Sequence, residues 1–136
     1  MSIRVASAAT PDIVELLESA TRAASTHRGG EQLLAAIYAG SEPNSVLADA
    51  VAHGSLWIAI DGDNTVGFAL RRNGVLEAVY VKKRHRRQGL GRKLVHAVVD
   101  ASDDILDAYA LPGDRATKSL YESFGWKARL LTMRGE

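Results

Sequence analysis

Apolar residues follow two different periods along the chain. In the first third they recur three or four positions apart, as at Ile13, Leu16, Leu17 and Ala20, which is typical of an amphipathic helix. From Leu56 onward, short apolar runs rich in valine and isoleucine alternate with turns that contain glycine and asparagine. The change of period predicts helices first and then a sheet whose strands follow one another.

The pattern predicts eleven elements in the order βαα(α)βββαβαβ. Strands are expected at Ile3–Ala6, Leu56–Ile60, Thr65–Arg71, Val75–Val81, Ile105–Leu111 and Lys127–Met133. Helices are expected at about Pro11–Ala24, Glu31–Tyr38, Ser45–His53, Gly91–Ala101 and from Asp114 to Phe124. The Asn73-Gly74 pair is a strong hairpin signal and makes the middle strands an antiparallel meander. We therefore expect one α/β domain over residues 1–136, with a mixed sheet flanked by helices.

Composition excludes several classes of protein. The chain has no cysteine, which excludes a disulfide scaffold, a cysteine nucleophile and a thiolate metal site, and suits the cytoplasm. The net charge is +1, so the whole chain does not predict nucleic-acid binding. No apolar run reaches the ~20 residues of a membrane span. Histidines and carboxylates show no metal-ligand spacing, and we expect no metal.

Residues 75–94 contain the most informative stretch. The strand Val75–Val81 leads into a basic loop, then into the sequence Arg-Arg-Gln-Gly-Leu-Gly at 86–91, and then into a helix that begins near Arg92. Glycine lets the main chain approach a ligand closely. The unpaired N–H groups of the first helical turn lie beside the loop, so strand, loop and helix together predict a pyrophosphate site.

Two familiar pyrophosphate motifs do not fit. A Walker loop needs Gly-Lys-Ser/Thr, but Gly91 is followed by Arg92 and Lys93. The dinucleotide fingerprint needs a third glycine where this chain has Leu94. The loop instead resembles the acetyl-CoA loop of the GCN5-related N-acetyltransferase (GNAT) superfamily, Arg/Gln-x-x-Gly-x-Gly/Ala after a strand that ends in valine.

Two further features carry the same resemblance. The sequence Ser-Leu-Tyr-Glu-Ser-Phe-Gly-Trp at 119–126 resembles the penultimate helix of the family, and the order of the elements is the family's over essentially the whole chain. The resemblance implies a mostly antiparallel sheet with a splayed central strand. It also implies an N-acetyltransferase whose cosubstrate, acetyl-CoA, is attacked directly by a primary amine. The acetyl-CoA-binding residues it implies are Val79, Tyr80, Val81, Arg86, Arg87, Gln88, Gly89, Leu90, Gly91 and Arg92. Gln88 and Asp114 depart from the family's usual basic residue and asparagine, and we expect Asp114 to cap a helix.

Two residues are candidates for proton transfer. The resemblance places Tyr121 near the CoA sulfur as the donor to the departing thiolate, and its ordinary pKa of ~10 suits that role. The alternative is an aromatic ring that packs at the edge of the core. Glu77 shares a face with Val79 and Val81 by the period of two, where it could act as a base, directly or through water. Alternatively, it is a solvated charge paired with Arg71 or Arg72.

The basic run at 82–87 has two interpretations. It could bind nucleic acid, but it lacks stacking aromatic residues, so we expect it to steer the polyanionic CoA. Residues 27–30 lie where the family shapes its acceptor site, although they could equally be a polar loop. We expect the acceptor to be an amine of a small molecule or a protein, and the chain to be a monomer or a homodimer. The alternative function is an acyl-CoA-binding sensor without turnover.

Overall fold

The computed structural model describes residues 1–135. The strands are β1 (Ser2–Val5), β2 (Leu56–Asp61), β3 (Asn64–Arg72), β4 (Val75–Val81) and β5 (Asp107–Ala108). The helices are α1 (Pro11–Ser25), α2 (Gly30–Tyr38), α3 (Pro43–Ala52), α4 (Leu90–Asp100) and α5 (Arg115–Glu122), with a short 3₁₀ turn at Lys83–His85. The strands form one sheet in the order β1-β2-β3-β4-β5.

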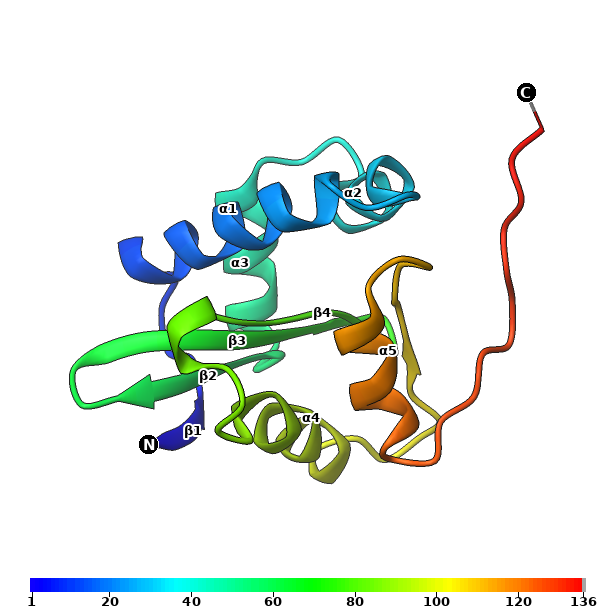
Figure 1. The fold of residues 1–136 in the computed structure, drawn as a ribbon. Helices are drawn as coiled ribbons and strands as arrows, with labels where there is room; N and C mark the ends of the chain where they lie inside the picture. Colours follow the sequence, from blue (N-terminus) through cyan, green and yellow to red (C-terminus); the bar gives the residue numbers. More distant parts are fainter. Residues whose placement is uncertain (136) are drawn as a thin grey trace.

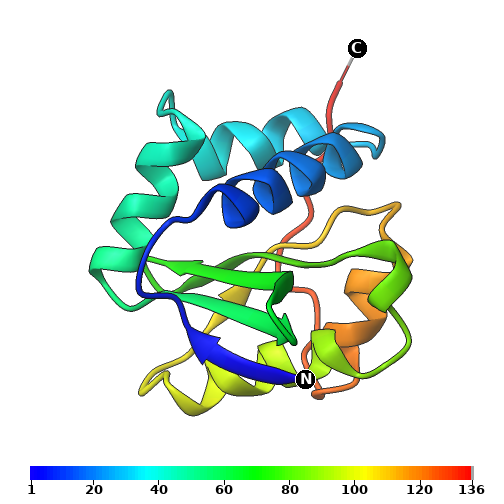
Figure 2. The same cartoon turned by 90° about the vertical axis from the view of Figure 1, so that its left-hand side faces the viewer.

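Helices cover both faces of this sheet. Figure 1 shows α1, α2 and α3 on one side and α4 and α5 on the other, and the view in Figure 2 confirms the layers. Each side has its own apolar core. Phe68 and Leu70 of β3 pack toward α1–α3, whereas Val66 and Ala69 pack toward α4 and α5. Because both faces of β3 are buried along its middle, this strand carries no polar side chain from Val66 to Leu70.

A β-bulge interrupts β4 at Glu77. Leu70 of β3 pairs with Ala78, but the next residue, Arg71, pairs with Leu76, so Glu77 has no partner on β3. A bulge adds one residue to a strand and bends it. Beyond the extra residue, the backbone N–H and C=O groups of odd-numbered and even-numbered residues therefore exchange the strand edges that they face. Before the bulge, the carbonyl of Leu76 faces β5 and accepts a hydrogen bond from the N–H of Tyr109, the residue after β5. After the bulge, the even-numbered residues face β3.

The bulge separates β4 from β5. The two strands are parallel, and they pair only at Val75 with Asp107 and at Leu76 with Ala108. No pairing continues along Val79–Val81 within residues 1–135. The predicted splay of the central strand is therefore confirmed, as is the mixed, mostly antiparallel sheet flanked by helices. The same divergence makes β5 much shorter than the predicted Ile105–Leu111.

The ends of the other predicted helices and strands lie within about two residues of those observed, with one exception. The prediction of a last strand at Lys127–Met133 is wrong for this structure, because no strand forms there. Residues 127–135, here called the C-terminal tail, run away from α5 without pairing as a strand (Figure 1). The residue pattern of a strand is present, but a strand also needs an adjacent edge to pair with. No helix within residues 1–135 is long and apolar enough to cross a membrane.

Candidate functional site

The edge of β4 beyond the bulge is unpaired. The Lys82 N–H donates to the Val66 carbonyl of β3 at 2.8 Å. Because residues of an antiparallel strand face the neighbouring strand alternately, Tyr80 also bonds to β3, while Val79 and Val81 face the other way. With β5 diverging, the N–H groups of Val79 and Val81 border the splay. Of the three residues predicted to present N–H groups here, Tyr80 is the one whose N–H faces β3.

The predicted glycine loop joins this edge to α4. Arg87 and Gly89 both have positive φ, at 64° and 77°, so the main chain curls and its N–H groups converge. A Cβ placed on Gly89 would meet no atom within 4 Å, so the space in front of the loop is open. Helix α4 begins at Leu90, and the N–H groups of its first turn have no acceptor inside the helix. Loop and helix therefore form a concavity of the kind that suits an anion.

Arginine side chains fix the geometry around the loop. The Arg86 Nε donates to the Val81 carbonyl at 2.9 Å, which ties the loop to the end of β4. Arg92 donates to the Ser123 hydroxyl at 2.7 Å and lies 4.6 Å from the centre of the Phe124 ring, which ties α4 to α5. Arg86 and Arg92, two of the three arginines predicted to bind acetyl-CoA at the loop, thus also hold the site together, and all three are exposed.

Gly91 lets α4 approach α5. A Cβ at this position would lie 3.4 Å from the Leu120 Cδ2 atom of α5. The close approach of the two helices brings Tyr121 into the same apolar core as Val81 and Leu90. The two glycines of the loop therefore differ in their surroundings, since Gly89 borders open space and Gly91 lies against a helix.

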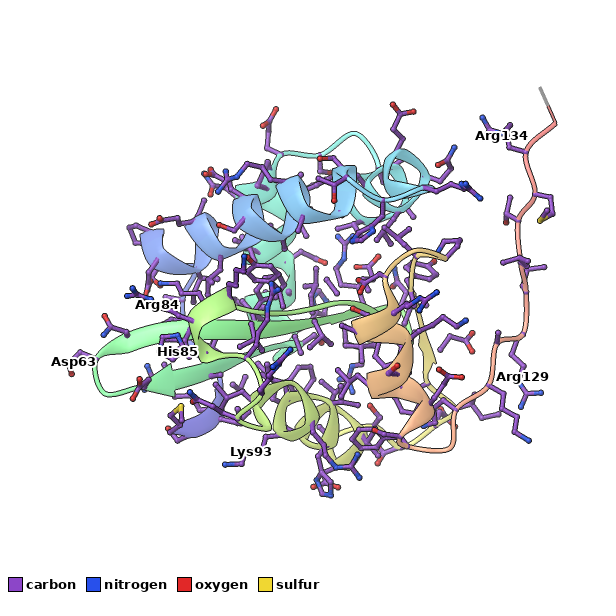
Figure 3. All side chains as sticks on the ribbon, in the orientation of Figure 1. Asp63, Arg84, His85, Lys93, Arg129 and Arg134 are labelled. Carbon is purple, nitrogen blue, oxygen red and sulfur yellow. The ribbon has the colours of Figure 1, made fainter. Side chains whose placement is uncertain are left out.

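The entrance to the loop carries a positive field. Residues 78–99 contain no aspartate or glutamate, while seven lysines and arginines lie within 82–93. Figure 3 shows Arg84, His85 and Lys93 around the segment that leads into α4. The His85 Nε2 lies 3.2 Å from an Asp61 carboxylate oxygen, which fastens the basic segment to the β2–β3 turn. Such a field attracts a polyanion before it reaches the loop.

Tyr121 combines a packed ring with an unpaired hydroxyl. Its side chain is 6% exposed, and its ring stacks on Trp126 with centroids 5.5 Å apart. The buried hydroxyl has no hydrogen-bond partner within residues 1–135. Burial raises the pKa of Tyr121 far above its ordinary value, and the Asp114 carboxylate raises it further. The ring of Tyr121 packs in the core, as the alternative interpretation of this residue predicts. Its hydroxyl keeps its proton and has no acceptor among residues 1–135.

Glu77 forms a buried ion pair with Arg72. The Arg72 Nε lies 2.5 Å from one carboxylate oxygen, and an Nη of the same guanidinium donates to the Ile37 carbonyl at the end of α2. Glu77 therefore points toward α2, whereas Val79 and Val81 pack toward α4. The expectation that the three share a face is wrong, because the bulge at Glu77 breaks the alternation. The predicted pairing with Arg72 is present.

Two loops meet near the open end of the splay. A Cβ on Gly113, after β5, would lie 3.4 Å from His27 Nδ1, and one on Gly29 would lie 3.4 Å from Leu111. The predicted acceptor loop at 27–30 thus contacts the segment that leads into α5. Asp114 caps α5 as expected, since it accepts from the Thr117 N–H at 3.1 Å. In residues 1–135 no group of histidines and carboxylates could hold a metal ion.

Comparisons with known proteins agree with this geometry. The family model described as an acetyltransferase (GNAT) domain matches residues 52–128. A ribosomal-protein-alanine N-acetyltransferase from Brucella melitensis has a TM-score of 0.66 and 22% identity, over 92% of this chain and 83% of its own. A GNAT family acetyltransferase from Streptococcus pneumoniae has a TM-score of 0.61 and 16% identity, over 99% and 97%.

A further structural match was solved with a CoA derivative. This aminoglycoside N-acetyltransferase, in complex with a bisubstrate analogue of CoA, has a TM-score of 0.58 and 18% identity, over 99% of this chain and 97% of its own. At these identities the matched structures establish the fold alone. No curated protein sequence matches the chain significantly.

Replacing Arg72 tests the ion pair at the bulge. We expect Arg72→Met to lower the free energy of unfolding by about 3–5 kcal/mol, because the Glu77 charge would remain buried without a partner. Urea unfolding measures the change. The double variant Arg72→Met/Glu77→Leu is the control, and it should recover most of the loss because it removes both charges. A single-variant loss below about 1 kcal/mol would mean that solvent screens the pair.

The pH dependence of stability tests the burial of Tyr121. The unfolded chain ionises this tyrosine above about pH 10, whereas the raised pKa keeps it neutral in the folded protein. The buried, neutral Tyr121 therefore stabilises the folded protein fully below about pH 10, and this stabilisation is lost as the pH rises further. Urea unfolding at a series of alkaline pH values should show a shallower decline for Tyr121→Phe than for wild type. Equal declines would place the hydroxyl in solvent.

Proposed function

Because this chain belongs to the GNAT acetyltransferase family, we propose that it transfers the acetyl group of acetyl-CoA to a primary amine by direct attack. The observation that carries the proposal is the unpaired edge of β4, which runs straight into the glycine loop and the start of α4. A row of free N–H groups followed by an anion site suits a ligand with an amide-containing arm and a pyrophosphate. Acetyl-CoA has both.

The residues present fit acetyl-CoA in two places. The N–H groups of the loop and of the first turn of α4, from Arg87 to Arg92, would hold the pyrophosphate in the open space beside Gly89. The amides of the pantetheine arm would pair with the unpaired edge at Val79 and Val81, in the manner of an added strand. The cations of residues 82–93 would steer the nucleotide toward the loop.

The transfer needs polarisation of the thioester carbonyl. A bond forms between the amine nitrogen and the carbonyl carbon, and the carbon–sulfur bond then breaks, so negative charge develops first on oxygen and then on sulfur. An N–H of the unpaired β4 edge would stabilise the oxygen, since no neighbouring strand in residues 1–135 uses it. We assign this task to Val79 or Val81.

The departing thiolate needs a proton, and Tyr121 is proposed to supply it. Its hydroxyl is buried and unpaired, so it has a proton to donate and no competing acceptor within residues 1–135. Burial raises the pKa of the tyrosine, but the same low-dielectric surroundings disfavour the thiolate as well, so the transfer stays balanced. The tyrosine then regains a proton from the solvent or from the amine.

The attacking amine must lose a proton, and Glu77 is the candidate base. It acts directly or through water from its position at the bulge, next to the splay. The Nε of Arg72 lies 2.5 Å from Oε1 of Glu77, whereas Nη2 of Arg72 lies 3.4 Å from Oε2. Because Oε2 is held less closely, it retains the capacity to accept a proton or a hydrogen bond. Arg72 would then hold the carboxylate in position.

The acceptor is proposed to be a primary amine of a small molecule or a protein. It would enter the splay beside the meeting point of residues 27–30 and the segment after β5. The matched structures include acetyltransferases named for an alanine of a ribosomal protein and for aminoglycosides, so both acceptor classes occur on this fold. CoA release with a panel of such amines measures turnover directly, and binding of acetyl-CoA with no turnover would favour a sensor.

Replacement of Gly89 tests the binding site. Acetyl-CoA should raise the melting temperature of the wild-type protein by mass action. Gly89→Val should abolish that rise, because a branched side chain would fill the space in front of the loop. Gly62→Val is the matched control, since Gly62 also has positive φ and open surroundings but lies in the β2–β3 turn. Wild-type affinity in Gly89→Val would refute the assignment of the loop.

Replacement of Tyr121 tests the proton donor. Tyr121→Phe keeps the ring and deletes the hydroxyl, so kcat should fall by roughly 10²-fold or more on general-acid magnitudes. The affinity for acetyl-CoA should stay near the wild-type value, because the pyrophosphate site is elsewhere. Tyr38→Phe is the control, since that hydroxyl bonds to Thr21 on the opposite face of the sheet. Full activity in Tyr121→Phe would leave protonation of the thiolate to water.

A further inference from the structure

A cavity of about 450 Å³ lies at one end of the sheet, around the turn between β3 and β4. Its walls come from Asn73 and Gly74 of that turn, from the ends of α3 and α4, and from the segment that leads into β5. The glycine loop follows the other end of β4, and the paired residues of β4 and β5 separate the cavity from the splay. The cavity is therefore distinct from the proposed acetyl-CoA site, and its volume is that of a small-molecule site.

Two arginines of β3 line the cavity and retain unused donors. Arg71 bonds to the two residues after α4 through one Nη, and its Nε and second Nη have no hydrogen-bond acceptor within residues 1–135. Arg72 uses its Nε and one Nη for Glu77 and the Ile37 carbonyl, which leaves its other Nη without an acceptor among the same residues. Guanidinium groups with N–H donors to spare are suited to a carboxylate.

Both guanidinium groups are held in place by the fold itself. The guanidinium carbon of Arg71 lies 5.0 Å from the centre of the Trp57 ring. Arg72 is fixed by its buried ion pair with Glu77. Because neither side chain is free to move, the binding of a carboxylate would order little that is not ordered already.

Other parts of the wall favour positive charge. Asp49 lies in the last turn of α3, and Asp103 and Asp104 follow α4. Within residues 1–135 Asp103 and Asp104 form no salt bridge, and Asp49 pairs only with His53, at 3.5 Å. The C-terminal ends of α3 and α4 border the cavity as well, and the carbonyl groups at the C-terminal end of a helix attract cations.

The balance of these charges selects the class of ligand. With His53 neutral, the wall carries two arginines and three aspartates. The arginines would repel a simple diamine, and the aspartates would repel a simple carboxylate. We infer that the cavity binds a free basic amino acid, with its carboxylate on Arg71 and Arg72 and its ammonium groups on the aspartates and the helix ends. The net positive charge of such a ligand offsets the excess of aspartates.

L-Lysine is the probe, and NMR locates it. Titration of the wild-type protein with L-lysine should give saturable shifts of the amide signals of Gly74, Ser102 and Asp103. Cadaverine, which is lysine without its carboxylate, and ε-aminocaproate, which lacks the α-ammonium group, should each bind more weakly by roughly tenfold or more, because each leaves charged groups of the wall unpaired. The titration needs no acetyl-CoA, so its outcome does not depend on the proposed function.

Three results of the titration would overturn the proposal. The first is the lack of a saturable shift at the residues of the cavity, and the second is equal affinity for L-lysine and cadaverine. The third is a set of shifts confined to residues 27–30, which would place L-lysine at the predicted acceptor loop.

Variants test the two kinds of wall separately. Asp103→Asn/Asp104→Asn removes two exposed charges, so the fold should be kept while the affinity for L-lysine falls by roughly tenfold or more. Asp63→Asn is the matched control and should bind as wild type does, because Asp63 is exposed at the other end of β3 (Figure 3). Arg71→Gln removes a charge from the carboxylate subsite and should reduce the preference for L-lysine over cadaverine. Wild-type affinity in the aspartate variant, or an unchanged preference in Arg71→Gln, would overturn the proposal.

Discussion

The site depends on one extra residue in β4. The bulge at Glu77 reverses the edge to which the following residues point, so Val79 and Val81 face away from β3 just where β5 has diverged. Unpaired N–H groups inside a sheet are costly, and a structure retains them only where something else satisfies them. The Arg72–Glu77 pair and its bond to the Ile37 carbonyl hold the bulge against α2, so a buried charge fixes the shape of the strand.

The rest of the site is tied to that strand through side chains that the sequence predicts as ligand contacts. Arg86 bonds the loop to the end of β4, and Arg92 bonds α4 to α5. Gly91 permits the helix contact that places the Tyr121 ring in the core shared with β4. As a result, the glycine loop, the unpaired edge and the candidate proton donor are parts of one packed unit.

Features that depend on local sequence signals are predicted correctly from the sequence. The glycine loop, the Asp114 cap and the turn at Asn73-Gly74 each depend on neighbouring residues, and each was found where expected. The face occupied by Glu77 could not be predicted by period, because a bulge has no mark in the strand's own residues and arises from pairing with β3. The absence of a strand at residues 127–133 likewise depends on the edge available to it. In both cases the residue pattern of a strand is present in the sequence. What the sequence does not show is the neighbouring strand with which that segment pairs.

The central claim is that the bare edge of β4 binds the arm of acetyl-CoA. Amide hydrogen exchange by NMR, with and without acetyl-CoA, tests it residue by residue. The N–H groups of Val79 and Val81 should exchange much more slowly when the ligand is bound, while that of Tyr80, already bonded to β3, should change little. Unchanged exchange at Val79 and Val81 under saturating acetyl-CoA would contradict the account.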